Sequence, residues 1–138
     1  MATVLFLCTG NSCRSQMAEG LARHHRPDHR FVSAGIEKHG LNEHAVAVMA
    51  ERGIDISSHR SQTLDELQLD DIDLVITVCD HAHDHCPVFP GDARVEHHGF
   101  PDPPRLAAEL SDPEAQLNCY REVRDQIESF VQHQLQID

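Results

Sequence analysis

A short apolar run near the amino terminus ends abruptly on a cysteine, and it constrains the fold more than any other stretch. Val4–Leu7 is continuously apolar, as in a strand that is buried on both faces of a parallel sheet. The small and polar sequence TGNSCRS follows Cys8, and a helical pattern then runs to the helix-stopping Pro27. A strand, a glycine-containing turn and a helix in this order predict the first unit of an α/β fold.

The same alternation continues along the chain. Further strands are predicted at 30–35 (RFVSAG), 73–79 (DLVITVC) and 93–98 (ARVEHH). Ser15 is expected to cap the first helix and Asn42 a second helix that ends near Gly53, while Ser111 and Glu114 fit a capping box for the last helix. A chain of 138 residues is the size of one domain, so these elements predict a single domain, 1–138, with helices on both faces of the sheet.

The composition narrows the class of protein. A formal net charge of −12 argues against nucleic-acid binding and means that any oxyanion must be captured by a local pocket. No apolar run approaches the roughly 20 residues of a membrane span, and the first residues lack a signal-peptide pattern, so we expect a cytoplasmic protein. Five cysteines, an odd number, are then more typical of catalysis, redox chemistry or metal binding than of a disulfide scaffold.

The loop after the first strand carries the strongest chemical signal. Ligands bind at the carboxyl ends of parallel strands, where Cys8 lies. Backbone N–H groups of the loop and the positive end of the following helix would cradle a tetrahedral oxyanion and favour the thiolate form of Cys8. Arg14 offers a planar fork of donors to the anion, and Ser15 can donate a hydrogen bond to the sulfur. The expected oxyanion-binding residues are Thr9, Gly10, Asn11, Ser12, Cys13, Arg14 and Ser15.

A plainer interpretation of this loop is a buried cysteine next to a surface arginine. The order of strand, loop and helix favours a nucleophilic site instead, with Cys8 and Arg14 as its catalytic residues. Cys13, inside the loop, is expected to pack beneath it rather than react.

Two further cysteines have the spacing Cys-x6-Cys. If the first and third strands are neighbours, Cys8 and Cys79 leave the sheet at the same edge, where a strand spacing of about 4.8 Å suits a disulfide. Cys86 lies seven residues on, in a predicted loop that is free to swing toward Cys79. The alternative is that Cys79 only closes a strand and Cys86 is an incidental thiol. Cys119, at the border of the last helix's apolar stripe, is expected to pack.

Asp102 follows the last predicted strand and lies between prolines in GFPDPP. This stiff loop would present a carboxyl group above the bound anion, and a nearby oxyanion favours its protonated, acidic form. An ordinary aspartate in a proline-rich turn is the plainer alternative.

Histidines alternate at His81, His83 and His85 in the sequence HAHDHC. Imidazoles and a thiolate can bind zinc or copper, which leaves a metal- or anion-binding sensor as one alternative function. Because the flanking sequence is typical of a loop, we interpret these histidines as solvated and assign no metal and no cofactor.

The segment CTGNSCRSQMAEG resembles the signature loop of the low-molecular-weight phosphotyrosine phosphatase superfamily, and within it the thioredoxin-coupled arsenate reductases. The similarity continues through SAGIEKHG, AERGIDISSH, DLVITVCDHAHDHCPVFPG and HHGFPDPP, so that it covers nearly the whole chain. The resemblance implies a three-layer α/β/α fold with a four-stranded parallel sheet in the order 2-1-3-4.

The resemblance also implies a reaction. The Cys8 thiolate would attack arsenate while Asp102 of the Asp-Pro pair acts as the acid, Cys79 would then attack Cys8 and release arsenite, and Cys86 would attack Cys79. Thioredoxin or a similar dithiol protein would reduce the final disulfide. Phosphate and sulfate would compete with arsenate, and we expect the protein to act as a monomer.

Asn11 and Ser33 resemble positions that brace the loop. In one branch of the superfamily, residues at the places of Asn11, Glu19 and Ser33 help to bind potassium, but Gln62 stands here where that branch has an acidic residue, so no ion is assigned. A tyrosine phosphatase is the other alternative. The chain has no Trp and only one Tyr with which to grip a phosphotyrosine ring, so only weak phosphatase activity is expected.

Overall fold

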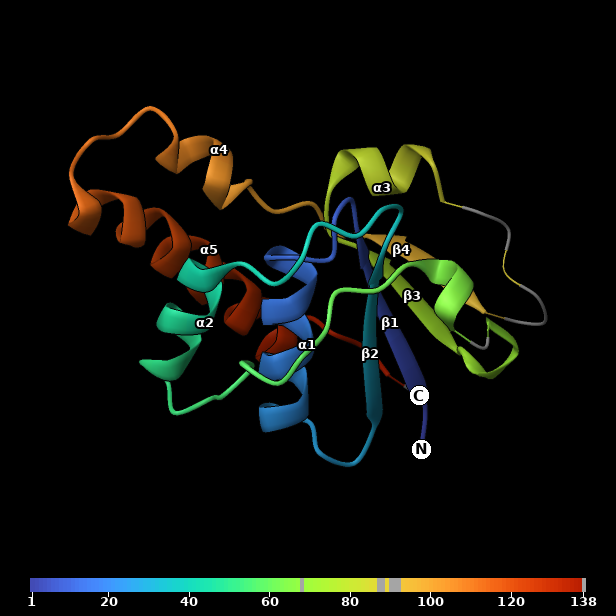
Figure 1. Cartoon of the computed structure of the whole chain (residues 1–138). Helices are drawn as coiled ribbons and strands as arrows, with labels where there is room; N and C mark the ends of the chain where they lie inside the picture. Colours follow the sequence, from blue (N-terminus) through green and yellow to red (C-terminus); the bar gives the residue numbers. More distant parts are fainter. Residues whose placement is uncertain (68, 87–88, 90–92, 138) are drawn as a thin grey trace.

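A four-stranded parallel sheet forms the centre of the protein in the computed structural model, which describes residues 1–67, 69–86, 89 and 93–137 (Figure 1). The strands are β1 (Thr3–Cys8), β2 (Arg30–Gly35), β3 (Leu74–Thr77) and β4 (Arg94–His97). Their order is β2-β1-β3-β4, which confirms the expected arrangement. Leu7 pairs with Thr77, so β1 and β3 are neighbours and end at the same edge.

Helices cover this sheet. They are α1 (Arg14–His25), α2 (Glu43–Ala50), α3 (Asp80–Asp84), α4 (Pro103–Ala107) and α5 (Pro113–His133), with 3₁₀ turns at Leu64–Glu66 and Leu69–Asp71. The long helix α5 packs on α1, α2 and α4, and α1 packs on β1 and β2. All of β3 and all of β1 except Thr3 are buried, as strands covered on both faces must be. None of the helices described here is long and apolar enough to cross a membrane.

Apolar periodicity explains the core. The stripe predicted for the last helix is buried at Tyr120, Val123, Ile127 and Val131, while Leu117 is only half-buried. These buried side chains lie on the helix that packs on α1, α2 and α4.

The helix caps confirm one prediction and correct two. Asn42 caps α2 and accepts hydrogen bonds from the backbone N–H groups of the second and third helical residues. Ser15 does not cap α1; it lies inside the helix, where its hydroxyl is used by the Cys8 sulfur 2.8 Å away. The cap of α5 is Asp112 rather than Ser111, because Pro113 takes the first helical position and makes the residue before it the cap.

The segment after β3 differs from its prediction. The strand ends at Thr77, not at Cys79, and residues expected in a loop form the short helix α3. Cys79 is the N-cap of this helix, and its sulfur accepts a hydrogen bond from the Ala82 N–H at 3.4 Å. This cap is what allows a short polar segment to turn into a helix directly behind the sheet edge.

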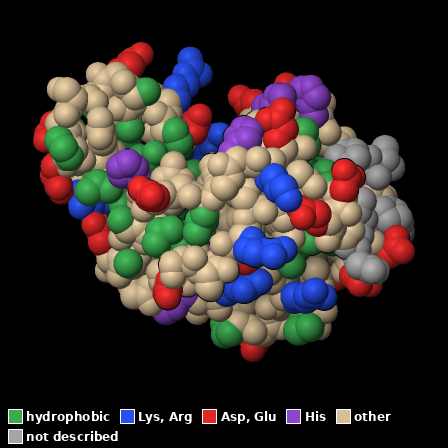
Figure 2. Space-filling view, in the orientation of Figure 1, with side chains coloured by type: hydrophobic (Ala, Val, Ile, Leu, Met, Phe, Trp, Pro, Cys, Tyr) green, Lys and Arg blue, Asp and Glu red, His purple; other side chains and the backbone are tan. Residues whose placement is uncertain are grey.

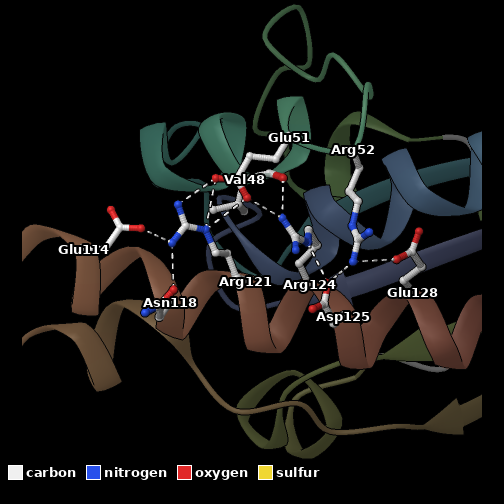
Figure 3. Close-up of polar contacts among 9 residues, drawn as sticks. All are labelled: Val48, Glu51, Arg52, Glu114, Asn118, Arg121, Arg124, Asp125 and Glu128. Atoms are coloured by element: carbon white, nitrogen blue, oxygen red, sulfur yellow. Dashed lines mark hydrogen bonds and ion pairs between the residues drawn. The ribbon is translucent and has the colours of Figure 1, made fainter.

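A cluster of charged side chains joins α2 to α5 (Figure 3). Glu51, at the end of α2, accepts hydrogen bonds from Arg121 at 2.8 Å and from Arg124 at 2.8 Å. Arg124 is buried and also donates to the Val48 carbonyl at 2.8 Å. The cluster further includes the ion pairs Arg121–Glu114, Arg52–Asp125 and Arg52–Glu128. It holds the carboxyl end of α2 against α5, while the opposite end of α2 borders the site described below.

This cluster predicts a pH-dependent stability. The hydrogen bond from Arg121, followed by that from Arg124, lowers the pKa of Glu51 below its ordinary value. A lowered folded-state pKa contributes stability above the unfolded pKa, and this contribution disappears as the pH falls through the folded pKa. We expect Glu51→Gln to lower the free energy of unfolding by no more than about 1 kcal/mol at pH 7, since the carboxylate is half-exposed, and by less at pH 3.

Urea unfolding at the two pH values measures this difference. Glu122→Gln, on the same helix but outside the cluster, is the control and should change stability equally little at both. An effect of Glu51→Gln that is the same at pH 7 and pH 3 would contradict the assignment.

Candidate active site

Cys8 ends β1 and is the buried centre of the site. Its sulfur lies 2.8 Å from the Ser15 hydroxyl and accepts a hydrogen bond from the Asn11 N–H at 3.2 Å. The Asn11 side-chain amide donates to the Ser15 oxygen at 2.8 Å, which leaves the Ser15 O–H to point at the sulfur. Two donors directed at one sulfur stabilise its thiolate form, the form that acts as a nucleophile.

Asn11 holds the loop in shape. It is fully buried and has a φ of 48°, in the left-handed region that asparagine tolerates better than most residues. Its side-chain oxygen accepts hydrogen bonds from Gln16 Nε2 at 3.0 Å and from the Gln62 backbone N–H at 2.8 Å. Asn11 therefore links the loop to α1 and to the segment after α2, in addition to orienting Ser15.

Substituting Asn11 should show this directly. Asn11→Ala removes three side-chain hydrogen bonds and leaves buried partners unsatisfied, so we expect a loss of about 2–3 kcal/mol in the free energy of unfolding. Asn11→Gly loses the same bonds but keeps the left-handed backbone accessible, and should be less destabilising by about 1 kcal/mol. Urea denaturation compares the two. A value for Asn11→Ala within about 0.5 kcal/mol of the wild type would show that the loop does not depend on this residue.

The loop packs closely against the chain that follows β2. A Cβ atom added at Gly35 would lie 2.2 Å from the Glu37 carbonyl oxygen and 2.7 Å from that of Thr9. A Cβ atom at Gly10 would lie 2.3 Å from Nδ1 of His39. Both glycines are needed for this close approach rather than for an unusual backbone angle.

Arg14 and Asp102 face one another across the mouth of the site. Nη1 of Arg14 donates to the Phe100 carbonyl at 2.9 Å, and Nη2 lies 3.7 Å from an Asp102 carboxylate oxygen. The two side chains border a pocket of about 380 Å³. Its lining residues are Cys8, Thr9, Gly10, Ser12, Cys13, Arg14, His39, Asn42, Asp102 and Pro104. The pocket brings the predicted nucleophile, guanidinium and carboxyl group together, with Ser15 and Asn11 buried behind them.

The described lining of the pocket offers no aromatic wall for a phosphotyrosine ring. Among the described residues that line it there is no Phe, Tyr or Trp. The single tyrosine, Tyr120, is buried and accepts a hydrogen bond from Asn42 at 3.3 Å instead of forming a wall.

The remaining cysteines have different environments. Cys79 is buried at the same sheet edge as Cys8, and its sulfur lies 3.2 Å from the Thr9 hydroxyl. Cys86 is half-buried just beyond α3, and burial raises its pKa. Burial also raises the pKa of Cys13, which packs in the core as expected. Cys119 is partly buried on α5, where its thiol reaches the Ala115 carbonyl at 3.6 Å.

The helix α3 separates Cys79 from Cys86. Cys79 caps its start and Cys86 follows two residues after its end. Seven helical steps of about 1.5 Å place the two α-carbons roughly 10 Å apart, whereas a disulfide needs about 4.4–6.8 Å. Cys86 lies outside α3, as expected for a loop residue, but the helix between the two cysteines has to change shape before they can form a bond.

Among the described residues, Ser33 does not hydrogen-bond to the loop directly but bonds to residues of α1 and of the segment after α2. Its hydroxyl donates to Glu19 at 2.6 Å, its carbonyl accepts from the Gln62 side chain at 2.8 Å, and Arg23 pairs with the same Glu19 at 2.9 Å. The side-chain oxygens of Asn11 and Glu19 thus already accept hydrogen bonds from protein groups.

Sequence reasoning missed His39 and Asn42, which line the pocket, as does Pro104 two residues after Asp102. The His39 N–H donates to the Gly10 carbonyl at 2.9 Å, and the Asn42 N–H donates to the Ser12 carbonyl at 2.9 Å. Asn42 was expected only as a helix cap. The available signal was their position, because both follow a strand that ends at the same sheet edge as Cys8.

Comparison with known proteins gives this arrangement a family. Residues 3–136 match the low molecular weight phosphotyrosine protein phosphatase family. The chain is 52% identical to an arsenate reductase of Bacillus licheniformis over 91% of this chain and 88% of that protein, and 48% identical to one of Bacillus subtilis over 90% and 88%. A solved structure of an arsenate reductase in the phosphate-binding state is 35% identical, covers 95% of this chain and 94% of its own, and has a TM-score of 0.70. The chain therefore belongs to the low molecular weight phosphotyrosine protein phosphatase family.

Proposed function

We propose that this protein reduces arsenate to arsenite at Cys8, and that the electrons come through Cys79 and Cys86 from thioredoxin or a similar dithiol protein. One observation carries the proposal: the Cys79 sulfur lies 3.2 Å from the hydroxyl of Thr9, the residue that directly follows the nucleophile. A phosphatase needs no second thiol at this place. The family relationship to arsenate reductases supports the same reaction.

The first step is a substitution at arsenic. Arsenate binds to the loop Thr9–Ser15. The guanidinium of Arg14 then turns away from Asp102 and donates to two oxygens of the arsenate. The Cys8 thiolate attacks arsenic, and protonated Asp102 gives its proton to a departing hydroxyl group of the arsenate, which leaves as water. Ser15 and the Asn11 N–H hold the thiolate until the anion arrives.

The second step moves two electrons. The Cys79 thiolate attacks the Cys8 sulfur, the bond between sulfur and arsenic breaks, and its electron pair stays on arsenic, which leaves as arsenite. Cys86 then attacks Cys79, so that Cys8 is released as a thiolate and the disulfide joins Cys79 to Cys86. A dithiol protein reduces that disulfide and completes the cycle.

All of these groups come from one chain, so a monomer is sufficient for the proposed cycle. The relay starts from reduced thiols, which the cytosol maintains, and we assign the reaction to that compartment. Phosphate and sulfate, as tetrahedral oxyanions, compete for the same pocket.

A coupled assay tests the proposal. The purified protein is incubated with arsenate, thioredoxin, thioredoxin reductase and NADPH, and the loss of NADPH is followed. We expect arsenate-dependent oxidation that phosphate inhibits competitively and that Cys8→Ser abolishes. If NADPH is consumed no faster with arsenate than without it, the proposal fails.

Phosphate-ester hydrolysis is the second candidate function. It is supported by the same loop and by membership of a phosphatase family. Because no aromatic side chain among the described lining residues can hold a phosphotyrosine ring, we expect only slow hydrolysis of small esters such as p-nitrophenyl phosphate.

A further inference from the structure

We propose that His81 and His85 form a binding site for a divalent ion such as Ni²⁺ or Zn²⁺ on the surface of α3, and that the bound ion holds this helix in its folded form. The two histidines are one helical turn apart and exposed. Their rings stack, with centroids 4.2 Å apart and an interplanar angle of 26°, so the His81 ring has to turn before one nitrogen of each ring faces the same ion. Figure 2 shows histidine side chains gathered over α3.

The hydrogen bonding of His85 prepares it as a ligand. Its Nδ1 lies 2.9 Å from the His81 carbonyl oxygen. A carbonyl only accepts, so Nδ1 carries the proton and Nε2 keeps a lone pair for a metal. Histidine ligands in metal sites commonly hold their second nitrogen in this way.

The neighbouring histidines lack this arrangement. His97 contacts Thr77 through Nδ1 at 2.8 Å and Asp80 through Nε2 at 3.0 Å, so both of its ring nitrogens are already used. The ring of His83 is tilted against that of His97, with centroids 4.4 Å apart. Within this cluster, His81 and His85 are the two histidines one helical turn apart, so they are the pair that can reach one ion from the same face of α3.

Two imidazoles at positions i and i+4 reach one ion from one face of a helix, and imidazole suits zinc and nickel. Within the described part of the chain, no group of three or more His, Cys, Asp or Glu side chains is placed to hold a metal. The ion thus has two protein ligands and completes its coordination with water. Such a site is reversible and responds to the metal concentration.

The location of the site gives it a consequence, which rests on the proposed relay. An ion that bridges residues one turn apart binds only the helical form, so it opposes unwinding of α3. Since Cys79 and Cys86 lie at the two ends of α3, their disulfide forms only after unwinding. Metal binding should therefore slow transfer of the disulfide from Cys8–Cys79 to Cys79–Cys86.

Calorimetric titration with NiCl₂ tests the site itself. Nickel is chosen because thiolates prefer softer ions, so it separates imidazole from cysteine binding. We expect His81→Gln and His85→Gln each to weaken the tightest binding event at least about tenfold, since even partners that only orient a metal ligand are worth that much. His133→Gln, an exposed histidine on α5, and Cys86→Ser should bind like the wild type. Equal affinity in the wild type and both variants, or a loss confined to Cys86→Ser, would overturn the site.

A second measurement tests the consequence. One equivalent of arsenate is added without reductant, the reaction is quenched by alkylation, and the Cys79–Cys86 disulfide is followed by mass spectrometry. Nickel should slow formation of this disulfide several-fold in the wild type and should not change its rate in His81→Gln. Equal slowing in both proteins would overturn the effect on α3. If the wild type forms no such disulfide even without nickel, the proposed relay fails and the effect on α3 with it, while the calorimetry still decides the metal site.

Discussion

Replacing Cys79 by serine is expected to abolish thioredoxin-coupled turnover of arsenate while leaving hydrolysis of p-nitrophenyl phosphate within about twofold of the wild type. The serine hydroxyl can still cap α3 through the Ala82 N–H, so the fold around the pocket is retained. It cannot attack the Cys8 sulfur, so the electron pair never reaches arsenic. The two activities share Cys8 and Arg14, and they separate only at the second thiol.

Cys119→Ser is the matched control, because this thiol lies partly buried on α5 and faces the Ala115 carbonyl rather than the pocket. Arsenate turnover and p-nitrophenyl phosphate hydrolysis by Cys119→Ser should both equal those of the wild type. Normal arsenate turnover by Cys79→Ser would show that the relay is wrong. A parallel loss of both activities would show instead that Cys79 supports the shape of the loop through Thr9.

Arg14→Lys is expected to lower kcat/KM for arsenate by roughly 10²–10³-fold, the cost of removing one donor from a site that stabilises a developing charge. The guanidinium uses two nitrogens at once, one on the Phe100 carbonyl and one facing Asp102. A lysine keeps the charge but supplies a single donor position, so it cannot span two oxygens of an anion. The same variant should raise the inhibition constant of phosphate.

The control is Arg105→Lys, an exposed position on α4 outside the lining of the pocket. It should change neither constant by more than about twofold. If Arg14→Lys retained full activity, charge alone would be sufficient and the fork geometry would not matter.

The sequence predicts the sheet well because its signals are local. The strands β1 and RFVSAG appear where expected, β3 lies within its predicted range but ends earlier, and the order of strands is the one implied by the family resemblance. The site follows from the same edge, since Cys8, Arg14 and Asp102 all come after strands or at a helix start. Such positions are fixed by topology and need no knowledge of side-chain contacts.

The missed features depend on contacts that sequence patterns do not contain. The segment after Cys79 is polar and rich in histidine, so it is typical of a loop, and the sulfur cap that turns it into α3 is not a usual capping residue. Ser15 was expected to cap a helix because its preference for that role is strong, but the Cys8 sulfur competes for the same hydroxyl. His39 reaches the pocket only through the close packing of Gly10, which no periodicity reveals.

The sulfur of Cys79, which caps the start of α3, would determine when this helix loosens during the proposed cycle. As a thiolate, Cys79 is a charged acceptor for the Ala82 N–H, whereas a sulfur within a disulfide is a poor one. Oxidation by Cys8 would therefore withdraw the support of the helix at the moment when Cys86 is needed. The chemical step itself would thus release the residue that completes it, without any signal from the reductant.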